Sequence, residues 1–457
     1  MYVDHAHPEY SAPETTDPFE AVRYDHAGDL LMRRAAASAS AGTGHDIVLH
    51  RNNVDGKGAS WGTHENYMML RSVPFDTVAA LMTAHFVSRQ IYAGSGRVGI
   101  GERSETAGYQ LSQRADYIHA ILGLQTTFER PIVNTRDESH SPSDYRRLHV
   151  IVGDANRMDV PQTLKLGATS MLLWLAEHAD ETGYDLAALL DSMALVDPVS
   201  AMHTVSHDLT LQAELPLRDG GVTNAWIMQV RLRAAVYEMG ALVYGTDTRG
   251  EPLWPDKPTT GIMALWGQAL ADVAAIRHAD DDTRLNMQPE ASRVEWLMKW
   301  QLLERLRRRH GLSWNDPGKL RAIDLGWAAL DPVRSIFEKV RSRTERTVDD
   351  RQVADAAGNA PQTTRAWLRA AVVNRYASQV VAVSWSHLTV RRHDAPQTGE
   401  ESYGNASRPI VRPSDLCSLD MSDPCAFDKA HMAAFVDGTR NADELITQID
   451  RNITAGR

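Results

Sequence analysis

The sequence predicts an α+β protein in which an antiparallel sheet packs with long helices, followed by a smaller carboxyl-terminal unit. Segments with the periodicity of strands mix with long helical segments, without a regular βαβ period and without an internal repeat. The chain has 457 residues, which exceeds the usual size of a single domain. These two observations favour one large α+β domain with a second, smaller one.

The composition is that of an ordinary globular protein. Hydrophobic residues make up 43% of the chain and charged residues 23%. The net charge of −11 argues against broad nucleic-acid binding. The two cysteines, Cys417 and Cys425, predict neither a disulfide framework nor a zinc site and fit a reducing cytoplasm. The sequence shows neither a secretory segment nor an 18-residue apolar run, so we expect neither export nor a membrane span.

The first ten residues predict an oxygen-rich site. Tyr2 and Asp4 alternate on a strand, so both side chains leave the same face. Pro8 is expected to end the ladder and to place Glu9 just beyond the turn. Such a cluster suits a hard cation such as Mg²⁺. Asp4 beside a metal could act as general base or nucleophile; alternatively, it caps a turn at the end of the strand.

The remaining elements follow from periodicity and from start and stop signals. Asp17-Pro18 predicts the start of a helix over 19–41. The other expected elements are strands at 45–51, 63–71 and 145–153, helices at 75–92, 162–178 and 223–244, and a basic amphipathic helix at 296–309. Loops are expected at 52–62, at 94–108, where five glycines predict flexibility, and at 391–423, where Ser, Pro, Asp and Gly predict mobility.

The loop at 52–62 and the strand after it form the densest polar stretch. Its glycines let backbone amides approach an anion, and Lys57 could meet a phosphate. The Gly-Lys-Ser/Thr order of a Walker loop is absent. His64 and Asn66 are expected on one face of the strand and Glu65 on the other. His64 is either a ligand or a hydrogen-bonded structural histidine.

A second polar group enters an otherwise apolar strand. Arg147 and His149 alternate onto one face, where charge is costly unless it is paired. Arg136, Arg146 and Arg147 could hold a carboxylate or phosphate through bidentate hydrogen bonds. The alternative is an internal ion-pair network, whose acidic members would be Asp137, Glu138 and Asp154.

Two further candidates lie near the carboxyl end. Arg365 and Arg369 are one helical turn apart and are expected to share a face. Trp385 lies in an alternating run over 381–390, where it could stack on a base or pack in the core. From the residues alone, the sequence predicts a Mg²⁺-dependent enzyme that handles a phosphate or a carboxylate.

The ordered motifs resemble the family of Pup ligases and depupylases, which are carboxylate–amine enzymes with a glutamine-synthetase-like fold. The motifs that carry the resemblance are Tyr-Val-Asp-His-Ala-His-Pro-Glu-Tyr (2–10), Asn-Asn-Val-Asp-Gly-Lys-Gly-Ala-Ser (52–60), His-Glu-Asn-Tyr (64–67), Gly-Ser-Gly-Arg-Val-Gly-Ile-Gly (94–101), Asn-Thr-Arg-Asp-Glu (134–138), Tyr-Arg-Arg-Leu-His-Val-Ile-Val-Gly-Asp-Ala-Asn (145–156) and Thr-Thr-Arg-Ala (363–366). The forms of residues 4–8 and 53–58 are similar to the depupylase branch.

This resemblance implies an ATP- and Mg²⁺-dependent depupylase. Such an enzyme hydrolyses the isopeptide bond between Pup and a substrate lysine, and it deamidates the carboxyl-terminal glutamine of Pup. Two alternatives stay open: a Pup ligase, and a truncated, inactive Pup-binding protein. The expected partners are Pup and pupylated proteins, with no nucleic acid and no membrane, and the expected oligomeric state is a monomer.

The resemblance also implies roles and boundaries. Asp4 would be the catalytic carboxylate. The metal residues would be Tyr2, Glu9 and His149, the nucleotide residues His64, Arg365 and Trp385, and the Pup-binding residues Arg136, Arg146 and Arg147. A glutamine-synthetase-like catalytic domain is expected over 1–372 and a small domain over 373–457. Because the family's Glu-x-Glu strand does not precede Met1, we expect that an amino-terminal segment is missing from this chain.

Overall fold

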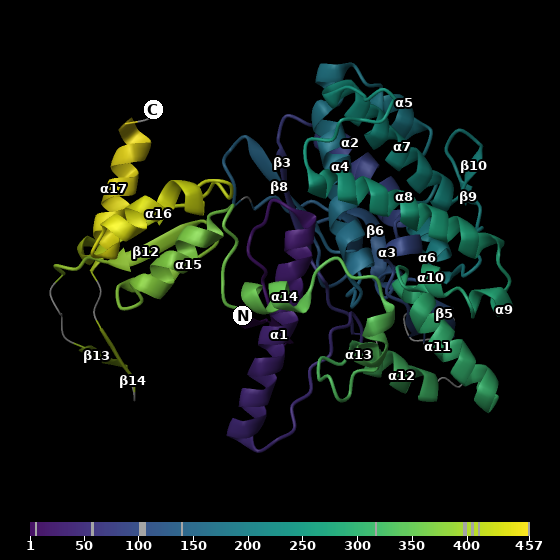
Figure 1. Ribbon diagram of the computed structural model, residues 1–457, viewed down its shortest axis with the longest axis horizontal. Coiled ribbons are helices and arrows are strands. Elements are labelled where there is room, and N and C mark those ends of the chain that lie inside the picture. Colours follow the sequence, from purple (N-terminus) through teal and green to yellow (C-terminus); the bar gives the residue numbers. More distant parts are fainter. Residues whose placement is uncertain are drawn as a thin grey trace. The chain divides into compact units, whose positions relative to one another are not determined.

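The computed structural model describes residues 1–4, 7–55, 59–99, 107–138, 140–315, 318–395, 400–403, 406–409 and 412–455. These residues form an α+β fold of helices and small sheets, as predicted (Figure 1). Two compact units are present: unit 1 comprises Met1–Tyr24, Ser139–Ser143 and Arg351–Arg457, and unit 2 comprises Asp25–Glu138 and Asp144–Asp350. The expected domain boundary after residue 372 falls inside helix α15 (Ala366–Arg375) and stays a prediction.

Unit 2 contains most of the helices. Its strands are β3 (Glu65–Leu70), β4 (Arg97–Gly99), β5 (Gly108–Gln110), β6 (Ile118–Gly123), β7 (Arg130–Asn134), β8 (Tyr145–Val150), β9 (Leu215–Pro216) and β10 (Val222–Thr223). Its helices are α2 (Phe75–Ser88), α3 (Gln90–Ala93), α4 (Asp159–Thr182), α5 (Leu186–Asp191), α6 (Pro198–His207), α7 (Ala225–Tyr244), α8 (Lys257–His278), α9 (Asp281–Arg284), α10 (Gln288–Ala291), α11 (Glu295–His310), α12 (Gly318–Ala328) and α13 (Ile336–Val340). Helix α1 (Pro18–Thr43) begins in unit 1 and continues into unit 2.

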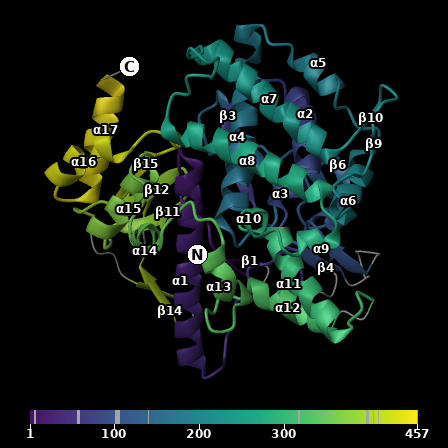
Figure 2. The ribbon, with the colours of Figure 1, turned by 45° about the vertical axis from the view of Figure 1, so that its right-hand side comes forward.

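Helices α2, α4, α7 and α8 pack against one another and carry much of the unit 2 core (Figures 1 and 2). Helix α4 buries Leu164, Leu172 and Leu175, which recur at helical spacing. A Cβ on Gly167 would lie 2.3 Å from the Ile262 side chain of α8. The close approach of α4 and α8 therefore requires glycine at this position.

Unit 1 has a core of its own. Its elements are β1 (Tyr2–Asp4), β2 (His7–Glu9), α14 (Asp350–Ala356), α15, β11 (Val380–Val383), β12 (His387–Arg391), β13 (Glu400–Tyr403), β14 (Ala406–Pro409), β15 (Leu416–Asp420), α16 (Lys429–Gly438) and α17 (Ala442–Ala455). Strands β11, β12 and β15 form an antiparallel sheet. Leu368, Val390, Leu419 and Leu445 are buried where this sheet meets its helices.

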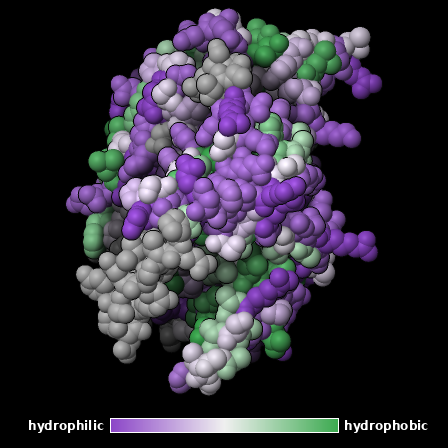
Figure 3. All heavy atoms as spheres, turned by 90° about the vertical axis from the view of Figure 1, so that its left-hand side faces the viewer, coloured by the Kyte–Doolittle hydropathy of each residue, from purple (hydrophilic) through white to green (hydrophobic). Residues whose placement is uncertain are grey.

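Among the described residues, one helix is long and apolar enough to cross a membrane, which by itself is weak evidence for a span. An 18-residue window of α8 has a mean hydropathy of 1.2, and 44% of it is buried. The packing of α8 against α4 and α7 is that of a core helix, which passes the same test. On the face shown in Figure 3, hydrophilic residues predominate and hydrophobic residues gather in separate patches.

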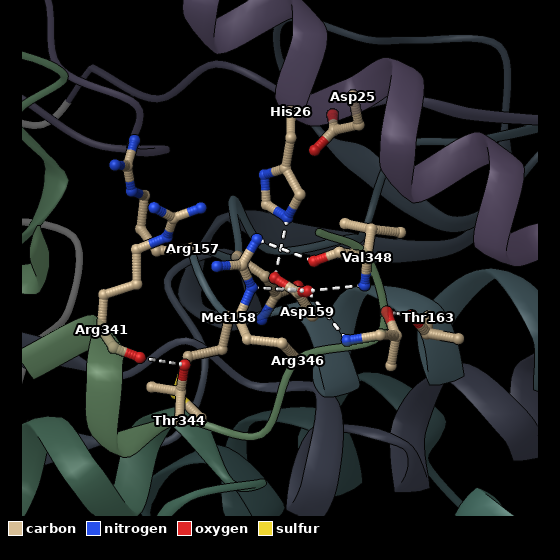
Figure 4. Close-up of polar contacts among 12 residues, drawn as sticks. Asp25, His26, Arg157, Met158, Asp159, Thr163, Arg341, Thr344, Arg346 and Val348 are labelled. Atoms are coloured by element: carbon tan, nitrogen blue, oxygen red, sulfur yellow. Dashed lines mark hydrogen bonds and ion pairs between the residues drawn. The ribbon is translucent and has the colours of Figure 1, made fainter. Parts of the chain in front are cut away.

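Asp159, the first residue of α4, joins three segments of unit 2 through one carboxylate (Figure 4). Its Oδ1 lies 3.0 Å from Nε2 of His26 on α1. Its Oδ2 accepts hydrogen bonds from Nε of Arg346 at 2.9 Å and from the backbone N–H groups of Thr347 and Val348. Beside it, Arg157 pairs with Asp29 and Glu338.

Three predicted elements differ in the structure. Residues 45–51 form no strand but a single bridge, His50 to Ala329, because the facing segment directly follows α12 and offers few residues to pair. The described part of 94–108 contains β4 and the first residue of β5, and these two strands pair with each other. Within 391–423, β15 pairs along its full length with β12. Polar composition suggested a loop there, but the alternation that buries Leu419 decides the structure.

Candidate functional site

The hairpin of β1 and β2 gathers the amino-terminal candidates on one face. Tyr2 lies opposite Glu9, and Asp4 lies opposite His7. Directly opposed residues point to the same face, and so do residues two apart in a strand. The phenol of Tyr2, the carboxylates of Asp4 and Glu9, and the imidazole of His7 therefore share one face of the hairpin.

The prediction that Pro8 ends the ladder is wrong. Pro8 lies inside β2, opposite Val3, and Glu9 is a member of the ladder rather than a residue beyond it. Proline is tolerated there because the sheet has only two strands, so each strand has an open edge where a missing N–H costs no ladder bond. The correction places Glu9 directly opposite Tyr2.

Neighbouring side chains shift the pKa of Tyr2. Its hydrogen bond with Ser11 lowers this pKa, but a hydrogen bond to Glu9, partial burial, and the negative charges of Glu9 and Asp4 raise it more. The net pKa of Tyr2 therefore lies above its ordinary value. A face with one phenol oxygen and two carboxylates matches the oxygen ligands that Mg²⁺ prefers.

In unit 2, strands β3 and β8 bring a second group of candidates together. The antiparallel register places Asn66 opposite His149 and Met68 opposite Arg147. Oδ1 of Asn66 lies 2.9 Å from Nδ1 of His149 and accepts a hydrogen bond from Nη1 of Arg147 at 3.1 Å. The rings of His64 and His149 meet edge to face, with centroids 4.9 Å apart. As predicted, His64 and Asn66 lie on one face of their segment, and Arg147 and His149 lie on one face of theirs.

These contacts assign the proton on His149. A guanidinium can only donate, so the atom of Asn66 that faces Arg147 is the carbonyl oxygen. That oxygen can only accept, so Nδ1 of His149 carries the proton. The other nitrogen, Nε2, then holds the lone pair of a neutral imidazole. A hydrogen bond to the other ring nitrogen is what orients histidines that bind cations.

Both histidines are neutral at pH 7. Burial lowers the pKa of His149 to about 3, helped by the positive charges of Arg147 and Arg136. His64 is exposed, yet the protein around it removes water from its imidazole. This desolvation, with the charges of Arg114 and Arg136, lowers the pKa of His64 to about 4. Neutral imidazoles beside guanidinium groups leave a net positive site, which suits an anionic group.

A buried ion pair supports this face from behind. Both carboxylate oxygens of Glu65 receive hydrogen bonds from Arg89, at 2.6 and 3.0 Å. A Cβ on Gly153 would lie 2.4 Å from Oε1 of Glu65, so glycine is needed where the segment after β8 passes this pair. Glu65 thus anchors β3 inward while its neighbours in sequence, His64 and Asn66, point to the other face.

The three predicted Pup-binding arginines have different surroundings. Arg147 pairs with Glu138 at 2.9 Å, as the ion-pair alternative predicted. Arg146 donates to the carbonyl oxygen of Arg71 and stacks over a phenylalanine, and the charge of Arg136 acts on both histidines. Of the other proposed acidic partners, Asp137 pairs with Arg71 and also interacts with the backbone of Arg147 and the charge of Arg146, whereas Asp154 accepts from Ser95, Ser112 and Gln113.

In unit 1, Arg365 and Arg369 share a face, as predicted, and both bind Glu14. Nε of Arg365 lies 2.7 Å and Nη2 of Arg369 lies 2.6 Å from the Glu14 carboxylate. Burial raises the pKa of Glu14, but the two arginines outweigh it and the net pKa is lowered. Arg365 is also buried and donates to the carbonyl oxygens of His140, Met421 and Ser422.

Trp385 does not lie in one long strand over 381–390. Strands β11 and β12 form a hairpin, and Trp385 lies in the turn between them because the chain reverses there to pair Val383 with Leu388. The residue is 39% exposed, and its ring stacks on that of His140, with centroids 6.2 Å apart. An exposed indole face on a turn is available to stack on a planar group.

Sequence reasoning missed two supporting residues. Glu14, which binds Arg365 and Arg369, lies in a stretch with no periodic signal. Arg114 is buried and donates to Oγ of Ser60 at 2.7 Å and to the carbonyl oxygen of Ile151, and burial lowers its pKa to about 9. It links the segment before His64 to the end of β8, a contact that spacing along the chain cannot reveal. Lys57 lies outside the described residues.

Comparisons with known proteins identify the family. A family model described as Pup-ligase protein matches residues 1–389. A Pup deamidase/depupylase from Mycolicibacterium smegmatis is 38% identical over 453 residues, covering 98% of this chain and 81% of the relative. A Pup–protein ligase from Micrococcus luteus is 35% identical over 408 residues, covering 86% of this chain and 82% of the relative.

A solved structure gives the same answer for the fold. The Pup ligase PafA in complex with ADP superposes with a TM-score of 0.74 at 26% identity, covering 94% of this chain and 86% of that chain. The fold is therefore that of the Pup ligases. The chain belongs to the Pup-ligase protein family, which confirms the family predicted from its motifs.

Proposed function

We propose that this protein is a cytoplasmic, ATP- and Mg²⁺-dependent depupylase. It hydrolyses the isopeptide bond between Pup and the lysine of a pupylated protein, and it converts the carboxyl-terminal glutamine of Pup to glutamate. Both reactions replace an amide nitrogen with a water oxygen at the same side chain, so one site can perform both.

The observation that carries this proposal is the shared face of the β1–β2 hairpin. It places the Asp4 carboxylate beside Tyr2 and Glu9, with a hydrogen-bonding phenol and a second carboxylate available to a hard cation. The choice of cleavage over ligation is supported by sequence: the depupylase relative is 38% identical across 98% of this chain, and the ligase relative is 35% identical across 86%.

Asp4 is the proposed catalytic carboxylate. As general base it takes a proton from the water that attacks the amide carbon, and the amine leaves with a proton. As nucleophile it attacks that carbon itself, the C–N bond breaks and the amine leaves with a proton from water, and a second water then hydrolyses the anhydride and regenerates the Asp4 carboxylate. Tyr2 and Glu9 would hold Mg²⁺, which supplies positive charge to phosphate and carbonyl oxygens when bound. His149 would be a further metal residue, which binds through the lone pair on Nε2.

The remaining predicted residues divide between nucleotide and Pup. Trp385 offers an exposed ring for stacking on the base of ATP, and neutral His64 offers a hydrogen bond to phosphate. Arg365 would support nucleotide binding indirectly, by holding the segment near Trp385, because its N–H groups donate to Glu14 and to three carbonyl oxygens. Arg136, Arg146 and Arg147 would bind carboxylates of Pup.

The proposal is tested with a fluorescent Pup conjugate, ATP and Mg²⁺, comparing the parent chain with Asp4→Asn. We expect the parent to release the substrate protein and to deamidate Pup ending in glutamine. Asp4→Asn should lower turnover by about 100-fold or more while Pup binding stays nearly unchanged, because a catalytic charge is lost from a nearly isosteric side chain.

Asp191→Asn, an exposed change at the end of α5, is the matched control and should leave turnover unchanged. Turnover of Asp4→Asn within about threefold of the parent would remove Asp4 from the mechanism. Ligation of Pup ending in glutamate to a lysine, with ATP consumed in proportion, would identify a ligase instead. Pup binding without either reaction would identify an inactive binding protein.

A further inference from the structure

Unit 2 contains a cleft whose lining residues belong neither to β3 nor to β8. Its volume is about 340 Å³, and it is formed by α10, α11 and the segment from the end of α13 to residue 343. The lining residues are Gln288, Met298, Gln301, Leu302, Arg305, Val340 and Arg343. This size falls at the lower end of the range of small-molecule sites. The lining contains two arginines and no acidic side chain.

In the wall of the cleft, each glutamine amide oxygen already accepts a hydrogen bond, whereas N–H donors remain. Arg343 donates to Oε1 of Gln288, and Nε2 of Gln288 donates to Oε1 of Gln301. Nε2 of Gln301 is itself bonded to the carbonyl oxygens of Arg284 and Met287. Both amide oxygens are therefore occupied within the wall. The groups that still have N–H donors to offer are the guanidinium groups and Nε2 of Gln288.

The hydrogen-bond partners of the two guanidinium groups are neutral oxygens. Arg305 donates to the backbone oxygen of Leu285, and Arg343 donates to an amide oxygen. Neither pairs with a carboxylate among the described residues, whereas Arg307 and Arg308 on the same helix both pair with Glu304. In a chain of net charge −11, a cleft with two such cations and no acidic wall favours an anion.

The rest of the wall is apolar. Met298 and Val340 are buried, and Leu302 is half-buried beside them. We propose that this cleft binds a small organic carboxylate, with its carboxylate between Arg305 and Arg343 and its apolar body against Met298, Leu302 and Val340. Bidentate hydrogen bonds from a guanidinium suit a planar carboxylate, and an apolar wall selects a ligand with a hydrocarbon or aromatic body.

The test uses 4-phenylbutyrate as the probe, with the full chain and ligand-observed NMR titration. We expect saturable binding to the parent chain. The double variant Arg305→Gln/Arg343→Gln should bind about tenfold more weakly or worse, because two charge-assisted bonds are lost. Arg309→Gln is the matched control: this exposed arginine lies on the same helix but outside the cleft, and the change should leave binding within about twofold.

Two ligand controls separate the parts of the proposal. The neutral 4-phenylbutanamide should bind more weakly than the carboxylate, and acetate, which has no apolar body, should bind more weakly as well. Thermal unfolding of each variant checks that the fold is intact. The proposal is overturned if the parent does not bind 4-phenylbutyrate, if the double variant binds it as the parent does, or if the neutral amide binds equally well.

Discussion

At the scale of single residues, Asn66 sets the tautomer of His149 and the orientation of Arg147. One amide oxygen accepts from both His149 and Arg147, so it fixes the protonated nitrogen of the first and the direction of the second. Asn66 lies across the ladder from His149, and this register sets the contact. We therefore regard Asn66 as a positioning residue for the β3–β8 face.

Replacing Asn66 by leucine should lower depupylation by about 10- to 100-fold, because His149 and Arg147 both lose the acceptor that orients them. Nitrogen NMR of His149 should show a mixture of tautomers in place of the Nδ1–H form. Asn66→Asp keeps an acceptor oxygen and should retain the Nδ1–H form. Met68→Leu, on the same strand face, serves as the control. An unchanged tautomer in Asn66→Leu would contradict the role assigned to Asn66.

How far the sequence predicts single residues depends on periodicity. Alternation along a strand placed Arg147 and His149 on one face, and His64 and Asn66 on another, because strands have a period of two. It could not show that these two faces coincide, since that requires the register between β3 and β8. Likewise, helical spacing paired Arg365 with Arg369, but nothing along the chain pointed to Glu14 as their common partner.

At the scale of elements, the Asp159 carboxylate holds helix α1 and residues 346–348 to the start of α4 (Figure 4). Burial raises the pKa of Asp159, but the hydrogen bonds and charges of His26 and Arg346 outweigh it, so the pKa lies well below its ordinary range. A negative charge at a helix amino terminus is also favoured by the helix dipole. Asp159 thus contributes stability only while it is ionised.

Asp159→Asn should destabilise the protein at pH 7 by roughly 3 kcal/mol, because His26 and Arg346 lose a buried ionic partner. A depressed folded pKa gives stability that is present above the unfolded pKa of about 3.9 and is lost as pH falls toward the folded value. The difference between variant and parent should therefore shrink below about pH 4. Denaturant unfolding at pH 7 and pH 3.5 measures it, with the exposed Asp180→Asn of α4 as control.

A constant difference between those two pH values would mean that the charge of Asp159 is not the source of the stability.

Elements such as α4 and α7 were predicted from helical periodicity because their own apolar residues define them. Short strands were harder: β4 and β15 exist because a partner strand pairs with them, and local composition at 94–108 and 391–423 indicated loops instead.

At the scale of the whole molecule, net charge and local charge have opposite signs. The chain carries −11, yet the β3–β8 face presents Arg147 and Arg136 beside neutral histidines. Pup is expected to be acidic from the family resemblance, so long-range repulsion must be overcome at this face. Glu138 neutralises Arg147 there and is itself 65% exposed at its side chain.

The two partners of this pair should affect Pup binding in opposite directions. Arg147→Ala should weaken binding by roughly 1.5–3 kcal/mol, because a charge-assisted bond is lost. Glu138→Gln should strengthen it, because Arg147 gains freedom to bind a carboxylate of Pup. Arg249→Ala, an exposed arginine elsewhere in unit 2, is the control. Fluorescence anisotropy with labelled Pup measures all three, and weaker binding by Glu138→Gln would assign the pair to structure.

The buried pair of Glu65 and Arg89 has a consequence for how such chains diverge. Either residue replaced alone leaves an uncompensated charge in the interior, at a cost of about 3–5 kcal/mol, whereas a joint change to apolar residues of similar volume is nearly neutral. Gly153 is tied to the same contact, since any larger residue would collide with the Glu65 carboxylate. Substitutions at these three positions should therefore be inherited together, and a family alignment should show them covarying while the exposed Met68 of the same strand varies independently of them.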